Sequence, residues 1–160
     1  MLDMKSGLTY EEYLKTGTEE DKKMIAEFFN RVNVNEENIK EINKINEEVD
    51  IAVFSITRCK DAASAIPFLI KLTEKNKNIN IRFWHREGNE ELLEELTGAK
   101  RVPSILRIED GKVTRMYIEF PKVVDEKINN NLEKKENIVN NLRSNEYDSA
   151  IEEEIFNILI

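Results

Sequence analysis

The segment VDIAVFSI, residues 49–56, constrains the fold of this chain more than any other part of the sequence. It is almost wholly apolar and rich in β-branched and aromatic side chains, as is typical of a strand buried on both faces. A helical pattern over residues 61–74 follows, and Ile79, Ile81 and Phe83 then alternate with polar residues, which predicts a second strand. A strand, a helix and a strand in this order predict a parallel pair of strands joined by a right-handed crossover.

A hairpin is predicted further along the chain. Residues 104–108 and 112–118 are two strand-like runs, and Asp110 and Gly111 lie between them. Asp-Gly between apolar runs is a strong hairpin signal, because a type I′ turn needs positive φ at both of its central positions. We therefore predict that these two strands are antiparallel.

Apolar residues at helical spacing predict the remaining elements. Candidate N-cap residues of three helices before the first strand are Thr9, Thr18 and Asn35. A short helix is predicted after the second strand, with Leu92, Leu93 and Leu96 on one face. After Pro121 we predict one closing helix, whose apolar residues are Ile128, Leu132, Val139 and Leu142. A last helix is predicted with Ile151, Ile155, Ile158 and Leu159. The prediction is a single α/β domain over residues 1–160, with an N-terminal helical extension (1–48), a core (49–120) and C-terminal helices (121–160).

Composition excludes several classes of function. The chain has 160 residues and a formal net charge of −8, which argues against a nucleic-acid binder that tracks phosphates. The N-terminal residues form neither the basic nor the apolar region of a signal peptide, and no apolar run has the length of a membrane span, so a cytoplasmic protein without membrane contact is expected. With one cysteine and one histidine, neither an internal disulfide nor a protein-only zinc site is expected, and no metal or cofactor is predicted. The oligomeric state stays open.

Two short segments resemble the active site of the thioredoxin family. Residues 55–62, SITRCKDA, leave the first strand and open the following helix. They resemble the family's W-C-x-D-C segment, with Cys59 at the first cysteine and Asp61 at the acidic residue, and Pro67 matches a proline that many members carry in this helix. Residues 101–104, RVPS, resemble the family's V-P-T segment, whose proline follows a cis peptide bond.

This resemblance implies a thioredoxin-like fold, with a βαβ unit and a ββ hairpin, over residues 49–120. The extra terminal helices resemble those of a bacterial subgroup of the family. In the family, the residue before the cis proline pairs its backbone with an extended peptide, which implies substrate docking by Val102 and Pro103. A trans proline at the start of an edge strand is the alternative for Pro103. The chain departs from the family motif at two positions, because Arg58 replaces the tryptophan and Ala62 replaces the second cysteine.

Cys59 is the candidate catalytic residue on chemical grounds as well. A thiol reacts as its thiolate, and the N-terminus of a helix favours an anion. Arg58 and Lys60 add positive charge on either side, whereas Asp61 opposes them. We predict a lowered pKa for Cys59. The alternative is an inert, buried side chain, since free cysteine is among the most buried residue types.

The sequence leaves two functions open. A dithiol reductase needs a second thiol to resolve the mixed disulfide, and Ala62 cannot supply one. The first function is therefore a single-cysteine thiol redox protein acting on protein or small-molecule disulfides, in which glutathione or another small thiol resolves the adduct, or recycles a sulfenic acid. An Fe–S cluster shared across a dimer is a minor variant. The second function is a redox-inactive peptide-binding or adaptor module that uses the same groove.

Overall fold

A four-stranded sheet forms the centre of the computed structural model, which describes residues 2–131 and 133–160. The strands are β1 (Val49–Ser55), β2 (Ile79–His85), β3 (Ser104–Glu109) and β4 (Lys112–Ile118), and their order in the sheet is β2-β1-β3-β4. β1 and β2 are parallel, whereas β3 is antiparallel to both β1 and β4. The predicted parallel pair and the predicted antiparallel hairpin are both confirmed.

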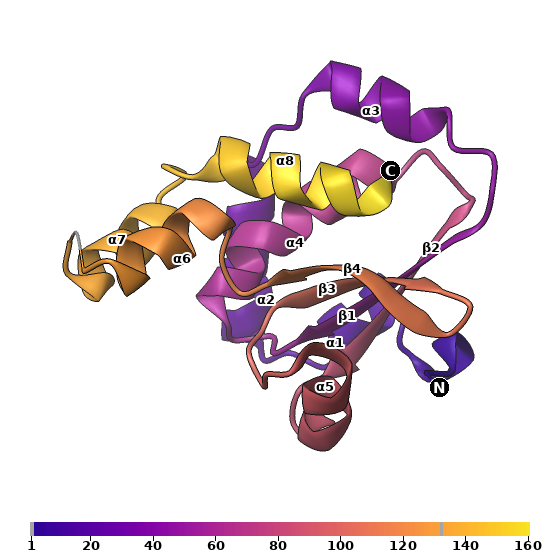
Figure 1. Cartoon of the computed structure of the whole chain (residues 1–160), viewed down its shortest axis with the longest axis horizontal. Helices are drawn as coiled ribbons and strands as arrows, with labels where there is room; N and C mark the ends of the chain where they lie inside the picture. Colours follow the sequence, from indigo (N-terminus) through magenta and orange to yellow (C-terminus); the bar gives the residue numbers. More distant parts are fainter. Residues whose placement is uncertain (1, 132) are drawn as a thin grey trace.

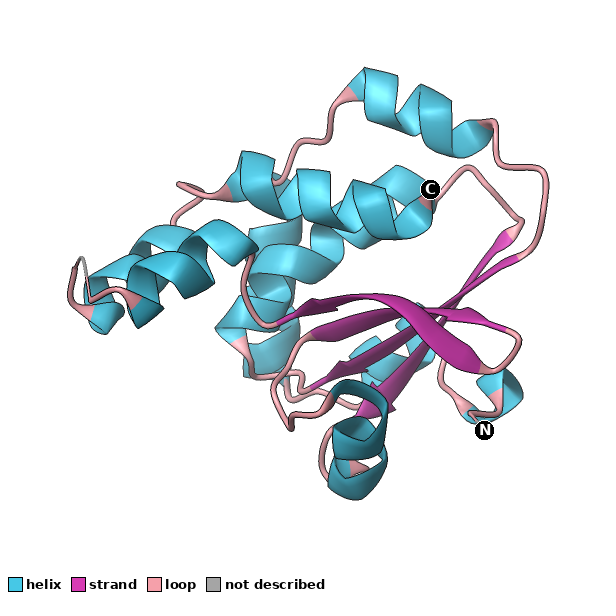
Figure 2. Cartoon of the chain, in the orientation of Figure 1, coloured by secondary structure: helices cyan, strands magenta, loops and turns pink. Residues whose placement is uncertain are grey.

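The two faces of the sheet are covered by different sets of helices (Figures 1 and 2). The helices are α1 (Tyr10–Lys15), α2 (Glu19–Arg31), α3 (Glu36–Asn43), α4 (Lys60–Thr73), α5 (Glu90–Thr97), α6 (Lys122–Asn129), α7 (Lys135–Leu142) and α8 (Asp148–Leu159), and a 3-10 turn, η1, spans Met4–Ser6. α4 contacts α2, α3 and α8, while α5 lies on the opposite side of the sheet. The result is a mixed α/β fold of the thioredoxin type with extra helices at both ends.

Alternation along β1 builds both layers of the core. Ile51 and Val53 belong to the larger apolar cluster with α4 and α8, and Ala52 and Phe54 belong to the smaller cluster under α5. All four side chains are fully buried. Successive residues of a strand point to opposite faces, so a strand at the centre of a three-layer fold must be apolar throughout.

The ends of the N-terminal helices follow from local side-chain chemistry. Thr9 and Thr18 each accept a hydrogen bond from a backbone N–H three residues ahead, and both positions form complete capping boxes. Asn35 caps α3 through the N–H of Glu37. The three predicted N-caps are therefore confirmed. Leu8 adds a backbone bridge to Phe83 and so pairs with the outer strand β2, a contact that no local pattern indicates.

The hairpin turn has the predicted geometry. Asp110 and Gly111 have φ values of 50° and 74°, both positive, as a type I′ turn requires. Asp tolerates this region better than most residues do, because its short polar side chain can hydrogen-bond locally.

The prediction of one closing helix after Pro121 is wrong, because the structure has two, α6 and α7. Asn130 caps α6 with its N–H on two carbonyl oxygens of the last turn, and Asn131 has a φ of 50°. Asparagine adopts this left-handed conformation more readily than most residues and commonly ends helices in this way. Leu132, a residue of the predicted closing helix, lies outside the described residues.

Within the described part of the chain, no helix combines the length and apolar character that crossing a bilayer requires.

Candidate functional site

Cys59 occupies the N-cap position of α4. Its backbone is extended, with φ −79° and ψ 117°, and its Sγ accepts a hydrogen bond from the N–H of Ala62 at 3.4 Å. The Cys59 N–H donates to the carbonyl oxygen of Ile56 at 3.0 Å, which closes the turn between β1 and α4. A sulfur atom therefore takes the place that Ser, Thr or Asp oxygens usually fill at the start of a helix.

The thiol is half-buried between two contrasting environments. On one side is a very small cavity of about 10 Å³, lined by side chains that include Tyr10, Tyr13 and Ile25 of α1 and α2. A space of that size is at the lower limit for one water molecule, and its walls are mostly apolar. On the other side Cys59 lines an open groove of about 560 Å³. The N-terminal helices thus cover the inner side of the thiol and leave the groove side open.

The predicted lowering of the Cys59 pKa is wrong. Burial raises the pKa of this thiol above its ordinary value, and the negative charge of Asp61 adds to the rise. The N–H groups of Ala62 and Asp61 and the positive charge of Arg143 lower the pKa, but they do not offset the loss of hydration. The start of a helix therefore does not activate a thiol that the surrounding apolar side chains dehydrate.

The two flanking cations, Arg58 and Lys60, are both exposed. Arg58 forms an ion pair with Glu87, with 2.7 Å between Nη2 and Oε1, and both side chains are 63% exposed. Lys60 is exposed, and no ion pair involves it within the described residues. Arg58 still interacts electrostatically with the thiol, because the charge of Cys59 contributes to the raised pKa of Arg58. Burial outweighs this attraction, so the pKa of Cys59 is raised all the same. Proximity in sequence did not indicate which way these side chains turn.

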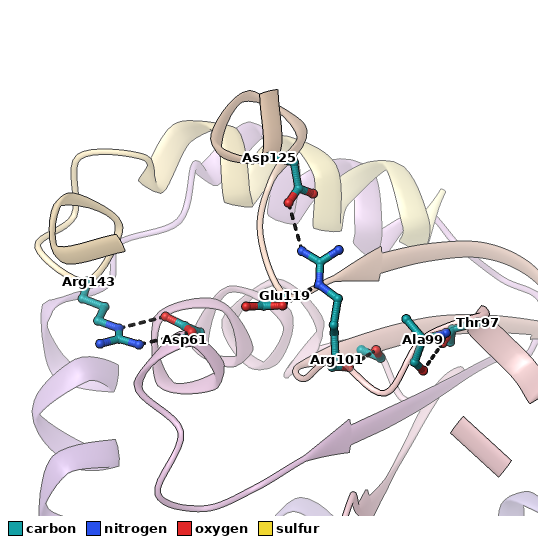
Figure 3. A network of polar contacts seen from close by, with 8 residues as sticks. Asp61, Thr97, Ala99, Arg101, Glu119, Asp125 and Arg143 are labelled. Carbon is teal, nitrogen blue, oxygen red and sulfur yellow. Dashed lines mark hydrogen bonds and ion pairs between the residues drawn. The ribbon is translucent and has the colours of Figure 1, made fainter. Parts of the chain in front are cut away.

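Asp61 is held by a residue that lies far away in the sequence. Its carboxylate accepts two hydrogen bonds from Arg143, Nε to Oδ1 at 2.8 Å and Nη2 to Oδ2 at 3.3 Å (Figure 3). The Asp61 side chain is 11% exposed and the Arg143 side chain 33%. Paired N–H···O bonds of this kind fix both position and orientation. They anchor the C-terminal end of α7 to the first turn of α4.

The loop before β3 forms the facing wall of the groove. The Val102–Pro103 peptide bond is cis, and the Pro103 carbonyl oxygen accepts a hydrogen bond from the N–H of Glu119 at 2.7 Å. Arg101 pairs with Glu119 and Asp125, so its guanidinium ties this loop to the end of β4 and to α6 (Figure 3). The backbone N–H and C=O of Val102 have no hydrogen-bond partner among the described residues.

The groove unites most of the residues singled out in the sequence. Arg58, Cys59, Lys60, Asp61 and Val102 all line it. Ala62 and Pro103 are buried behind its walls, where they shape the backbone and offer no side-chain chemistry.

Sequence reasoning did not single out Arg86, Lys100, Arg101, Glu119 and Arg143, which also line this groove. Of these five residues, Arg101 alone lies in a segment with a family resemblance, RVPS, which could have indicated its place in the groove. Arg143 is separated from Asp61 by 82 residues, and no motif marks it.

One family model, described as thioredoxin, matches residues 7–143. The chain belongs to the thioredoxin family. The match reaches beyond the core and includes α1 to α3 together with α6 and α7. Arg143, the partner of Asp61, is the last residue it covers.

Two solved structures resemble this thioredoxin-family chain over nearly its whole length. One is a protein of unknown function from Pseudomonas aeruginosa, with a TM-score of 0.78 and 13% identity over 98% of this chain and 93% of that chain. The other is a scaffold carrying an HIV epitope, with a TM-score of 0.78 and 12% identity over 98% of this chain and 94% of that chain. At such identity the likeness shows a shared fold. No curated protein matches the sequence.

Proposed function

We propose that this chain is a cytoplasmic thiol redox protein of the thioredoxin family that exchanges disulfides through Cys59 alone. The observation that carries the proposal is the presence of the Cys59 thiol and the unpaired backbone of Val102 in one open groove. An extended peptide that hydrogen-bonds to Val102 would run along the groove past the sulfur. The cysteine would then attack a disulfide delivered by that peptide or by a small molecule.

The exchange takes place in two balanced steps. The Cys59 thiol first loses its proton to solvent, and its sulfur attacks one sulfur of the substrate disulfide. A Cys59–substrate disulfide forms, the original S–S bond breaks, and the other half leaves as a thiolate that takes up a proton. A small thiol such as glutathione then attacks the substrate sulfur of the mixed disulfide. A glutathione–substrate disulfide forms, the Cys59–substrate bond breaks, and Cys59 leaves as a thiolate that takes up a proton. Ala62 stands where a resolving cysteine would be needed, so the second thiol has to come from outside.

The raised pKa of Cys59 favours a second candidate function, a redox-inactive module that binds extended peptides. A thiol whose pKa lies above its ordinary value is almost wholly protonated at neutral pH and exchanges slowly. In such a protein the same groove would hold a peptide segment without covalent chemistry.

Reaction of Cys59 with a neutral disulfide distinguishes the two functions. The protein is incubated with 2-hydroxyethyl disulfide across pH, and the mixed disulfide is followed by intact mass spectrometry. Cys59→Ser and the urea-unfolded chain serve as the unreactive control and as the fully accessible reference. Redox function predicts an adduct on the folded protein that glutathione removes, formed faster as pH rises through the thiol pKa. An adduct that forms only after unfolding would refute it and support the binding module.

The substitution Ala62→Cys is a separate check of the scaffold. It restores a second thiol at the position of the family's second cysteine. If the groove still supports catalysis, this variant reduces insulin with dithiothreitol faster than the parent does, because it no longer depends on an external thiol to resolve the mixed disulfide. Absence of any gain in a folded variant would count against the redox function.

A further inference from the structure

The groove beside Cys59 carries a charge opposite to that of the whole chain. Six cationic residues line it, namely Arg58, Lys60, Arg86, Lys100, Arg101 and Arg143, against two carboxylates, Asp61 and Glu119. Glu87, Glu94 and Asp125 pair with these cations from outside the lining, so six positive charges face five negative ones. The groove therefore has an excess of one positive charge in a protein whose formal net charge is −8. Such a local reversal of sign attracts ligands of the opposite charge and orients them.

We propose that this groove docks an acidic, extended segment of a partner protein. The inference rests on the proposed function in one respect, since the docked segment is what would bring a disulfide to Cys59. The docking itself needs only the charged side chains and the backbone of Val102.

Ion pairs divide the six cations into two groups with different roles. Arg58, Lys100, Arg101 and Arg143 each pair with a carboxylate, at distances from 2.5 to 3.4 Å. These pairs hold the walls in place, and partner carboxylates cancel much of their charge. Lys60 and Arg86 take part in no ion pair within residues 2–131 and 133–160. They are the two cations most available to a ligand.

Lys60 and Arg86 come from separate segments beside Cys59. Lys60 is the first residue of α4, and Arg86 directly follows β2, where its N–H donates to the Ser55 carbonyl oxygen at 2.9 Å. Both residues line the same groove as the thiol. Two acidic side chains of one extended segment can therefore meet separate cations while the segment passes Cys59.

Backbone groups without hydrogen-bond partners favour a peptide as the ligand. The N–H and C=O of Val102 lack partners among the described residues, and an extended chain offers complementary groups at regular spacing. A long polyphosphate backbone would in addition meet the repulsion of a chain with net charge −8. The unpaired cations of the groove and the unpaired backbone groups of Val102 together favour an acidic peptide.

The test measures binding to the whole protein without any thiol chemistry. The probe is a short, cysteine-free, fluorescein-labelled peptide in which glutamate alternates with serine, and the matched probe has glutamine in place of each glutamate. We expect the acidic peptide to bind more tightly by fluorescence anisotropy. Its affinity should fall as salt rises from about 0.01 M to about 0.15 M, since the Debye length shortens from about 30 Å to about 8 Å.

Charge reversal locates the binding site. Lys60→Glu with Arg86→Glu should weaken binding of the acidic peptide about ten-fold, given that each exposed ion pair contributes modestly. The matched control reverses Lys75 and Lys77, two exposed lysines that follow the C-terminal end of α4. Equal affinity of the acidic and glutamine peptides, or equal loss in both double variants, would overturn the inference. Circular dichroism confirms that each variant is folded.

Repeating the titration with Cys59→Ser separates this inference from the proposed redox function. Binding of the acidic peptide by that variant, together with no exchange by the parent protein, would support the docking site and refute the redox function. Exchange by the parent protein without any preference for the acidic peptide would support the redox function and overturn the docking inference. Preference for a single-stranded oligonucleotide over the acidic peptide would overturn the inference in favour of a phosphate ligand.

Discussion

Removing Arg143 should destabilise the protein more than removing the charge of its partner. The two residues share a pair of hydrogen bonds, but Asp61 is nearly buried whereas a third of the Arg143 side chain is exposed. In Arg143→Gln a buried carboxylate keeps its charge and loses its cation. In Asp61→Asn the guanidinium that remains can be hydrated. We therefore expect the two substitutions to lower the free energy of unfolding by unequal amounts.

The size of the loss follows from the exposure of the pair. Breaking a fully buried ion pair costs about 3–5 kcal/mol, and an exposed one contributes about 0.2–1 kcal/mol. With one partner buried and the other partly hydrated, we expect about 2 kcal/mol for Arg143→Gln and about 1 kcal/mol for Asp61→Asn. For a domain of this size about 2 kcal/mol lowers the melting temperature by about 4–8 °C.

The assay is urea unfolding of both single variants and of the double variant. Because Asp61→Asn removes the unpaired charge, the double variant should be more stable than Arg143→Gln alone. Arg58→Gln is the matched control, since its ion pair with Glu87 is highly exposed and should contribute little to stability. Equal losses for Arg143→Gln and Arg58→Gln would refute the reasoning, and so would a double variant less stable than Arg143→Gln.

Three further predictions concern single side chains. The folded state raises the pKa of Cys59, so it favours the protonated thiol. The stability of the parent relative to Cys59→Ser should therefore hold below about pH 8.5 and fall as pH rises through the pKa of the folded state. Urea unfolding at several pH values measures this difference. Gly7→Ala should cost about 1–3 kcal/mol in the same assay, because a Cβ at Gly7 would lie 2.7 Å from the Trp84 ring; an unchanged midpoint would contradict this. Tyr13→Phe should cost about 1–3 kcal/mol by removing the buried hydrogen bond to the Ser55 hydroxyl, 2.9 Å long, and a neutral result would mean that Ser55 finds another partner.

Local patterns were enough to predict most of the secondary structure. The apolar run of β1, the alternation in β2 and the Asp110–Gly111 turn are properties of a few neighbouring residues, and the structure confirms each of them. Helix N-caps were equally predictable, because Thr9 and Thr18 bond to N–H groups three residues away. The break between α6 and α7 was missed, since it depends on Asn131 taking a left-handed conformation that its sequence permits without requiring.

The sequence by itself determined the order of the strands, the family resemblance and the position of Cys59 at a helix start. All three depend on the types and spacing of residues that are close together in the sequence. Only the tertiary structure decided the electrostatics of that cysteine. Its pKa depends on apolar side chains from α1 and α2 that exclude water and on an Asp61–Arg143 pair that spans 82 residues. The basic groove likewise gathers cations from four separate segments. Hydration and charge act through space, so spacing along the chain cannot predict their balance.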